Sequence, residues 1–338
     1  MESNDESSYT VGLTYNLKKG IQTDAEDMEA EYDSIDTIYG IKNALEKAGC
    51  HVVLLEADHM LFNKLQNNRF DIVFNIAEGI FGRAREAQVP AILNFFQIPF
   101  TGSDETTLCI SLDKSLTKRL LSTYCIKTPR YQVFNTATEE LDATLKFPLI
   151  VKPNAEGSSK GISDCSVAQN EQELRTILKR CIDTYCVPFL VEEYISGREL
   201  TVGILGNGDD MIVIPPMEIV YKNQNETFHV YSYQVKRNYQ QYVKYECPAH
   251  LDENIIREVM NISKQIYQAL ECRDFSRIDY RVSPEGEIYF IEINPLPGLA
   301  PGYSDFPMAA EFIGIPYDEL IVKILNSALK RYGMAPIK

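Results

Sequence analysis

Short hydrophobic runs alternate with helical patterns over the first hundred residues. Ile35, Ile38, Ile41, Leu45 and Ala48 recur at the spacing of one helix face, and the apolar runs on either side have the length of buried strands. The pattern predicts strands at residues 9–15, 51–55, 70–77 and 98–101, and helices at residues 34–48 and 85–96. Strands and helices that alternate in this way predict a small doubly wound α/β lobe.

The rest of the chain predicts two further lobes of mixed helix and strand. The second contains helices at residues 113–124 and 171–185 and strands at residues 131–134, 147–151 and 162–168. The third contains strands at residues 189–195, 199–205 and 211–221, a helix at residues 253–270, a hairpin and two closing helices. Polar stretches at residues 18–30 and 222–247 are expected to be mobile loops. We therefore expect an α/β protein with domains at residues 1–105, 106–188 and 189–338.

One predicted hairpin has an apolar and a polar face. Residues 277–282 and 287–294 are its strands, and Glu285 and Gly286 are expected to form a two-residue turn. Because side chains alternate between the faces of a strand, one face is expected to enter the core. Its side chains are Ile278, Tyr280, Val282, Tyr289, Ile291 and Ile293, whereas Ile288 and Phe290 fall on the polar face.

The polar face of this hairpin brings acidic side chains together. The expected register places Asp279 opposite Glu292 and Arg277 opposite Asn294, with Cβ atoms roughly 4.5–5.5 Å apart. Two carboxylates and an amide at that spacing, with one arginine to neutralise them, suit Mg²⁺ held against substrate phosphates. The alternative is a solvent-facing strand with scattered charges. The stiff exit at residues 295–298, Pro-Leu-Pro-Gly, favours the metal site.

Two other segments have the residues of a phosphate and nucleoside site. Lys152 ends an apolar strand, and residues 154–161 follow as a loop of small residues whose N–H groups and serines can contact phosphate. A plain hairpin turn is the alternative for this loop. Residues 192–199 fit a hinge whose backbone contacts adenine while Glu199 accepts ribose hydroxyls, although an ordinary strand and turn has the same pattern.

Charge and cysteine usage narrow the class of protein. The formal net charge of −15 over 338 residues argues against nucleic acid or an anionic membrane as a partner. The N-terminus lacks the apolar core of a signal peptide, and no run has the length of a membrane helix. The eight cysteines show no paired CxxC pattern, as expected for buried thiols of a cytoplasmic protein.

The chain resembles the ATP-grasp superfamily, and within it the D-alanine–D-alanine ligases. The resemblance rests on four features that occur in this order: Lys152, the loop at 156–161, the hinge at 192–199 and the four polar hairpin residues. The segments FDIVFNIAEG, LDKSLTKRLL, EINPLPGL and PMAAEFIG extend the resemblance over nearly the whole chain. It implies an ATP-grasp fold of three lobes that clasp ATP. It also implies an ATP-dependent carboxylate–amine ligase that forms an amide through an acyl-phosphate and releases ADP and phosphate.

The resemblance implies roles in nucleotide and metal binding. The phosphates of ATP would be contacted by Lys114 and Lys152 and covered by Ser158 and Ser159. Adenine would be held by Glu192 and Ile195, and the ribose by Glu199. Two Mg²⁺ ions, for which Mn²⁺ could substitute, would be held by Asp279, Glu292 and Asn294.

It also implies the residues that act on the reacting groups. Arg277 would orient the acyl-phosphate and its tetrahedral adduct, and Ser158 would also belong to the catalytic residues. Gly298 would supply an amide to the developing oxyanion, and Ser304 a hydroxyl to the carboxylate of the acceptor. Lys236 aligns with a catalytic lysine in a lid formed by residues 222–247, which would exclude water from the anhydride.

The positions that contact substrates depart from the family pattern. A long insertion follows the first strand, so either Glu31 or Asp33 is the carboxylate for the amine of the first substrate. Glu78 replaces a histidine, Arg237 a tyrosine and Asp305 a leucine. The alternative is that these are surface changes. Unpaired carboxylates in a pocket cost several kcal/mol, so we expect basic or polar substrates rather than D-alanine.

Three other functions compete with this hypothesis. One is authentic D-alanine–D-alanine ligase, another is a non-catalytic ATP-binding module, and the third is carboxylation of the biotin-enzyme type. Arg277 argues against the binding module, because nucleotide binding alone does not require it. The expected partners are ATP and small amino-acid or peptide substrates, without nucleic acid or membrane. The sequence leaves open the substrates, their stereochemistry and whether the chain forms a homodimer.

Overall fold

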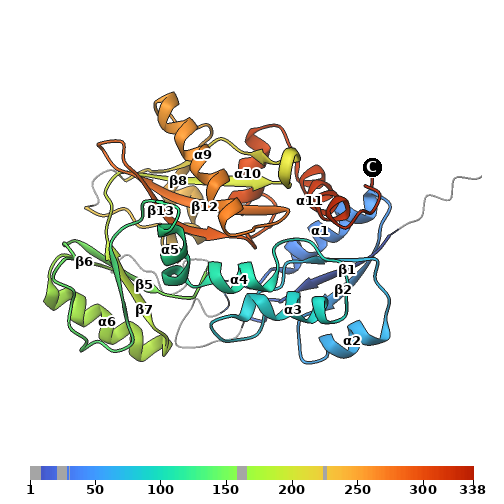
Figure 1. Ribbon diagram of the computed structural model, residues 1–338, viewed down its shortest axis with the longest axis horizontal. Coiled ribbons are helices and arrows are strands. Elements are labelled where there is room, and N and C mark those ends of the chain that lie inside the picture. Colours follow the sequence, from blue (N-terminus) through green and yellow to red (C-terminus); the bar gives the residue numbers. More distant parts are fainter. Residues whose placement is uncertain (1–8, 21–28, 30, 158–165, 224–226) are drawn as a thin grey trace, which may run out of the picture.

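The computed structural model describes residues 9–20, 29, 31–157, 166–223 and 227–338. Three sheets and the helices around them form the molecule (Figure 1). Ser158, Ser159 and most of the polar stretch expected at residues 18–30 lie outside the described residues. No helix in the described part of the chain is long and apolar enough to cross a membrane.

The first sheet is parallel and has the predicted strands. Its strand order is β2-β1-β3, and its elements are β1 (Thr10–Tyr15), β2 (His51–Glu56), β3 (Ile72–Asn75), α1 (Ile35–Lys47), α2 (Leu61–Asn67) and α3 (Gln88–Phe95). The prediction missed α2. The helix expected from residue 85 begins as a 3-10 turn, η1 (Arg85–Ala87), and the strand expected at residues 98–101 is reduced to a single bridge at Phe100.

The second sheet is antiparallel, in the order β4-β7-β5-β6. Its strands are β4 (Tyr131–Phe134), β5 (Leu149–Pro153), β6 (Val167–Ala168) and β7 (Phe189–Glu193), and α6 (Glu171–Tyr185) packs against it (Figure 1). The expectation that the third lobe begins with the strand at residue 189 is wrong, because β7 pairs with β4 and β5. We propose that the boundary of the third lobe follows β7.

The third sheet has the order β11-β10-β8-β12-β13, with β9 paired to β8. Its strands are β8 (Arg198–Leu205), β9 (Ile212–Val213), β10 (Met217–Tyr221), β11 (Val243–Glu246), β12 (Phe275–Val282) and β13 (Ile288–Asn294). The single strand expected at residues 211–221 is split into β9 and β10 by Pro215 and Pro216, which lack the N–H that a ladder requires.

Three helices pack between this sheet and the first lobe: α4 (Glu105–Leu112), α10 (Asp305–Phe312) and α11 (Tyr317–Arg331). Two others, α5 (Lys114–Ser122) and α9 (Glu253–Ala269), pack against the third sheet itself. The buried faces of α1 and α11 share one hydrophobic core, so the first and last helices of the described chain pack together (Figure 1). The prediction missed α4. The loop expected at residues 222–247 also contains α7 (Tyr233–Arg237), α8 (Tyr239–Tyr242) and β11.

The hairpin β12–β13 has the predicted register from Arg277 to Asp279. From Tyr280 to the turn its register differs by one residue from the prediction. Asp279 pairs with Glu292 and Arg277 with Asn294, as predicted. The turn has three residues instead of two, since Ser283 N donates to Glu287 O, and an irregularity beside Asp279 restores the register. The predicted faces are therefore wrong near the turn: Ile288 and Phe290 are buried, whereas Tyr289 and Ile291 are partly exposed.

Candidate active site

Two adjoining cavities lie beside the third sheet. The larger, of about 670 Å³, lies between the first lobe and the loop that follows β13. The smaller, of about 100 Å³, lies between the second and third sheets and is lined by Lys152, Ile195 and Glu199. Lys236 and Arg277 line both cavities. A group bound in one cavity can therefore reach a group bound in the other at these two residues.

A buried row of charges forms one wall of the smaller cavity. The carboxylate of Glu192 lies 3.0 Å from Lys118 Nζ and also pairs with Lys152 Nζ. Burial by itself would raise the pKa of Glu192, but the two lysines lower it below its ordinary value. Burial lowers the pKa of Lys118 to about 8. The sequence analysis missed Lys118, although it lies one helical turn after Lys114 on α5.

The carboxylate expected to accept the ribose is buried and paired in this structure. Glu199 accepts hydrogen bonds from Arg281 Nη2 at 2.8 Å and from Tyr221 Oη at 2.7 Å. Burial nevertheless raises its pKa above the ordinary value. Ile195 lines the same cavity, on the loop that connects β7 to β8. The three residues predicted for the nucleoside, Glu192, Ile195 and Glu199, therefore line the same cavity.

The three predicted metal ligands lie on neighbouring strands. Asp279 accepts from Thr201 Oγ1 at 2.6 Å, and Asn294 Nδ2 lies 3.5 Å from Asp279 Oδ2. Burial opposes ionisation of Glu292, but Lys114, Lys152 and Arg277 together lower the pKa of Glu292 to about 2. Lys114 Nζ lies 3.3 Å from the Glu292 carboxylate. This edge of the sheet thus holds an ionised carboxylate beside the cations expected to contact phosphate.

Arg277 lies between the predicted metal ligand Asp279 and Asp305, and it lines both cavities. Its Nε and Nη2 donate to the two oxygens of Asp279 at 3.0 and 2.8 Å, and its Nη1 lies 3.5 Å from Asp305. Tyr231 also donates to Asp305, at 3.2 Å. The expectation of an unpaired carboxylate at Asp305 is therefore wrong. Asp305 lines the smaller cavity and contacts Arg277, so it supplies no free charge to the larger one.

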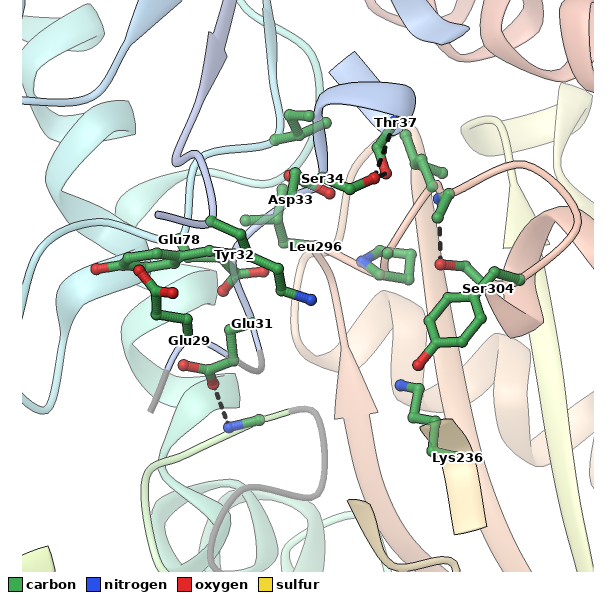
Figure 2. Close-up of a pocket in the computed structure, with 18 of the residues that line it drawn as sticks. Glu29, Glu31, Tyr32, Asp33, Ser34, Thr37, Glu78, Lys236, Leu296 and Ser304 are labelled. Atoms are coloured by element: carbon green, nitrogen blue, oxygen red, sulfur yellow. Dashed lines mark hydrogen bonds between the residues drawn. The ribbon is translucent and has the colours of Figure 1, made fainter. Parts of the chain in front are cut away.

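Opposite charges lie on opposite sides of the larger cavity. Glu31 and Glu78 are on one side, and Lys236 and Ser304 are on the other (Figure 2). The cavity is also lined by Asp33, Arg237 and Gly298. A Cβ atom at Gly298 would lie 2.8 Å from Ser304 Oγ, so only glycine fits there without displacing the serine. The arrangement suits a substrate with a positive group at one end and a carboxylate at the other.

Arg85 was not among the predicted site residues. It neutralises part of the negative charge on the acidic side of the larger cavity. Its guanidinium pairs with Glu31, lies 3.3 Å from Glu156 and donates to Ala155 O at 3.1 Å. Gly157 N also donates to Glu31. Arg85 and Glu86 could have been found as a pair of charges at the start of an otherwise apolar predicted helix. The sequence left open whether Glu31 or Asp33 is the carboxylate for the amine of the first substrate. Of these two, Glu31 already forms an ion pair with Arg85.

The buried carboxylate of Glu86 makes stability depend on pH. Burial and the charges of Glu31 and Glu156 raise the pKa of Glu86 to about 7, against Arg85 and Lys114, which lower it. The native state then binds more protons than the unfolded chain between the two pKa values, so stability falls as pH rises through that range. We expect Glu86→Gln to stabilise the protein by on the order of 2 kcal/mol at pH 8, and by less at pH 5.5.

Urea denaturation of the Glu86→Gln variant and the unmodified protein at both pH values measures this difference. Glu46→Gln, on the exposed side of the same lobe, is the control. Equal stabilisation by Glu86→Gln at the two pH values would show that its carboxylate ionises normally.

The predicted site residues in the described part of the chain gather around these cavities. Lys114 lies in a small recess with Glu86 and Glu292, beside the larger cavity. The two cavities are lined by Lys152, Glu192, Ile195, Glu199, Arg277, Asp279, Glu292, Asn294, Lys236, Glu31, Asp33, Glu78, Arg237, Gly298, Ser304 and Asp305. Ser158 and Ser159 lie outside the described residues.

Solved structures of ligases resemble this fold. The D-alanine–D-alanine ligase of Bacillus anthracis in complex with ATP superposes with a TM-score of 0.74 at 23% identity, covering 96% of this chain and 99% of that one. The VanG D-Ala:D-Ser ligase of Enterococcus faecalis gives a TM-score of 0.72 at 21% identity, covering 95% and 99%. These likenesses confirm the predicted ATP-grasp fold.

Sequence comparisons identify the family. Residues 121–326 match the family described as D-ala D-ala ligase C-terminus. The D-alanine–D-alanine ligase of Aquifex aeolicus is 34% identical over 87% of this chain and 94% of its own length. An uncharacterised protein, y4sG, of Sinorhizobium fredii is 32% identical over 86% of each chain. The chain belongs to the D-alanine–D-alanine ligase family, whose members are ATP-dependent ligases that form C–N bonds.

Proposed function

We propose that this ligase activates the carboxylate of a small amino acid or peptide with ATP and joins it to an amine. The observation that carries the proposal is the wall shared by the two cavities, where Lys236 and Arg277 line both. ATP in the smaller cavity would direct its γ-phosphoryl group toward a carboxylate in the larger one. An amine would then displace phosphate from the acyl-phosphate, leaving an amide, ADP and phosphate.

For the nucleotide, the support comes from the smaller cavity. We propose that Lys114 and Lys152 contact the phosphates, with Ser158 and Ser159 covering them, and that Ile195 and Glu199 hold the nucleoside. Glu192 was expected to hold adenine. Because its carboxylate pairs with Lys118 and Lys152, we propose that it also orients Lys152.

The residues at the metal edge fit magnesium. Asp279, Glu292 and Asn294 offer oxygen atoms, which Mg²⁺ prefers, and the low pKa of Glu292 keeps its carboxylate ionised. We propose that they hold two Mg²⁺ ions, for which Mn²⁺ could substitute. When bound, the ions would neutralise the charge that develops on the transferring phosphoryl group.

The remaining roles concern the reacting carbonyl and the acceptor. We propose that Arg277 orients the acyl-phosphate and that Gly298 N–H donates to the oxyanion. Ser304 and Lys236 would hold the carboxylate of the acceptor, since both lie on the positive side of the larger cavity. Arg237, exposed at the end of α7, would cover this side.

Authentic D-alanine–D-alanine ligase is the second candidate, favoured by the activity for which the Aquifex aeolicus relative is named. The charged residues Glu78 and Arg237 favour a different substrate. A third candidate, a non-catalytic ATP-binding module, is disfavoured by the position of Arg277 between the cavities. We also infer a cytoplasmic location, which suits the free thiols of the seven described cysteines.

One assay separates these candidates. Release of ADP and phosphate is measured for pairs of D- and L-amino acids, including D-alanine alone, and the products are identified by mass spectrometry. We expect little or no dipeptide from D-alanine alone and faster turnover with basic or polar amino acids. Efficient formation of D-alanyl-D-alanine would favour the second candidate, and ATP binding without turnover of any pair would favour the third.

ATP with Mg²⁺ is expected to raise the melting temperature, because a ligand that binds only the native state stabilises it, by about 2.7 kcal/mol at a hundredfold excess over Kd. Lys152→Ala should lose most of that shift. Lys179→Ala, on an exposed position of α6 in the same lobe, should keep it. Differential scanning fluorimetry at millimolar ATP measures both, and an unchanged shift in Lys152→Ala would contradict the phosphate assignment.

The segment at residues 222–247 is expected to close over the bound substrates. Its exposed Arg237 is a site for trypsin. An anionic ligand in the cavity would hold the side chain of Lys236 in one position. Limited proteolysis should therefore cleave this segment more slowly in the presence of ATP, Mg²⁺ and the acid substrate. Equal cleavage with and without ligands would argue against a lid.

A further inference from the structure

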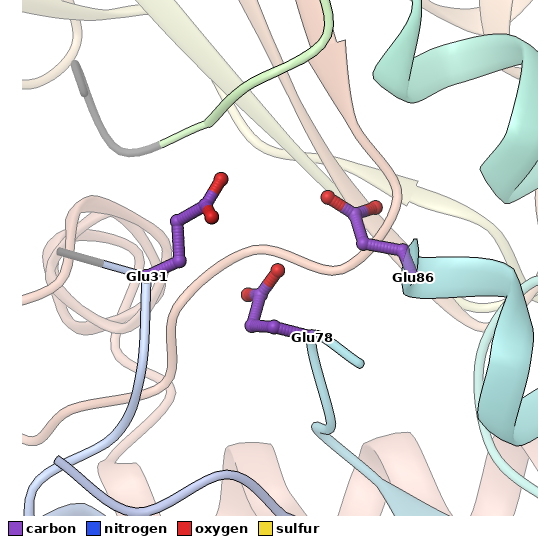
Figure 3. A group of neighbouring side chains, drawn as sticks. All are labelled: Glu31, Glu78 and Glu86. Atoms are coloured by element: carbon purple, nitrogen blue, oxygen red, sulfur yellow. The ribbon is translucent and has the colours of Figure 1, made fainter. Parts of the chain in front are cut away.

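Three carboxylates from separate segments converge on the acidic side of the larger cavity. Glu31 precedes α1, Glu78 follows β3 and Glu86 lies in η1, and each points toward the same space (Figure 3). One oxygen from each lies within 4.8 Å of the other two. Carboxylates this close repel one another unless positive charge or protons lie between them.

The three carboxylates differ in what neutralises them. Glu31 pairs with Arg85 and accepts from Gly157 N. In the described part of the chain, Glu78 and Glu86 have neither a hydrogen bond to their carboxylates nor a cationic group within ion-pair distance. Glu86 is nevertheless only 8% exposed and faces the cavity. Among the described residues, two carboxylates beside the larger cavity therefore lack a partner.

The charge of the cluster indicates how much positive charge would complete it. Burial and the neighbouring carboxylates raise the pKa of Glu78 and of Glu86, so protons balance part of the charge when no cation is bound. When all three carboxylates are ionised, they carry three negative charges against the one positive charge of Arg85, so two negative charges remain. A single amino-acid ammonium would neutralise one of them. A substrate with a second positive group would neutralise both.

We propose that Glu78 and Glu86 form a subsite for a second cationic group, an ammonium or a guanidinium, on the acid substrate of this ligase. The inference rests on the proposed function, because it assigns the substrate to the larger cavity. The cluster borders Gly157, at the end of the proposed phosphate loop, and lies across the cavity from Lys236 and Ser304 (Figure 2). Its occupant is therefore the activated acid rather than the acceptor, whose carboxylate belongs on the positive side.

A divalent metal ion would also balance two charges, but the geometry favours an organic cation. Glu31 Oε1 already accepts from Arg85 and Gly157, so a metal would have to share this oxygen or use only the other one. An ammonium or guanidinium also donates directionally to two carboxylates, which suits Glu78 and Glu86.

Binding of lysine or ornithine, compared with norleucine, tests the subsite. Norleucine matches lysine in length but lacks the second charge. Both enantiomers are titrated by calorimetry into the protein with Mg²⁺ and a non-hydrolysable ATP analogue. We expect the diamino acid to bind at least about tenfold more tightly than norleucine, the effect of one hydrogen bond to a charged group. Glu86→Gln and Glu78→Gln should each remove that difference.

The outcomes separate the subsite from the proposed function. Equal binding of lysine and norleucine, or unchanged lysine binding by Glu86→Gln, overturns the subsite even if other amino acids release ADP. Stabilisation by Mn²⁺ alone that Glu86→Gln abolishes, without lysine binding, also overturns it and identifies a metal site. Lysine binding that requires Glu86, without ADP release with any acceptor, supports the subsite and overturns the proposed function. Glu46→Gln, which lines neither cavity, should behave like the unmodified protein.

Discussion

Asp279→Asn and Glu292→Gln are each expected to lower the rate of ADP release by at least about a thousandfold while the protein stays folded. Both side chains lie on the polar face of the β12–β13 hairpin, away from the core residues on its other face. Each substitution keeps the shape of the side chain but removes the negative charge that would hold Mg²⁺. The rate is measured at saturating ATP over a range of Mg²⁺ concentrations, and folding by the melting temperature.

Glu287→Gln is the matched control, because Glu287 lies near the turn of the same hairpin and pairs with the exposed Lys127. Its rate should equal that of the unmodified protein. A near-normal rate in Asp279→Asn, with an unchanged dependence on Mg²⁺, would remove the metal assignment. Loss of folding in both site variants would instead show that these carboxylates are structural.

Arg277→Lys is expected to lower turnover by about a hundredfold or more while ATP–Mg²⁺ still raises the melting temperature. The guanidinium donates two bonds to Asp279 and also faces Asp305, and an ammonium cannot reproduce that planar geometry. The charge is kept, so a loss of rate would come from orientation of the acyl-phosphate. Single-turnover measurements of acyl-phosphate formation and amide formation distinguish the step that is slowed.

Arg198→Lys provides the comparison, because Arg198 makes a similar paired contact with Glu218 on the same sheet but lines neither cavity. We expect that variant to keep the normal rate. If Arg277→Lys also keeps the normal rate, Arg277 supplies only charge. If it loses ATP binding as well, Arg277 belongs to the nucleotide site.

The strand pairing of the hairpin shows which features a local sequence pattern predicts correctly. It also shows two errors, in turn length and in regularity, that offset each other. Sequence alternation placed Asp279 opposite Glu292, and the structure confirms that pair. The turn is one residue longer than predicted, and the irregularity beside Asp279 offsets the error. Between the turn and that irregularity the predicted faces of β13 are inverted, because a one-residue slip moves the side chains of the slipped strand to the other face.

The sequence by itself determined the features that depend on neighbours along the chain. These include the parallel strands of the first lobe, the α6 helix, the acidic pair on the hairpin and the lysine at the end of β5. A strand or helix has a fixed repeat, so its pattern of apolar residues indicates which side chains share a face. Resemblance to a family then supplied the order of the lobes and the class of reaction.

Only the tertiary structure decided the contacts between distant segments. The packing of the lobes buries Lys118 against Glu192, turns Asp305 toward Arg277 and brings Glu31, Glu78 and Glu86 together. No periodic pattern along the sequence predicts these contacts, because each joins side chains from elements that are far apart in the chain. Each also depends on which charged side chains are already neutralised by neighbouring ion pairs. The reaction class was therefore accessible from local pattern and resemblance, whereas the grouping of Glu31, Glu78 and Glu86 beside one cavity became visible only when its walls were assembled.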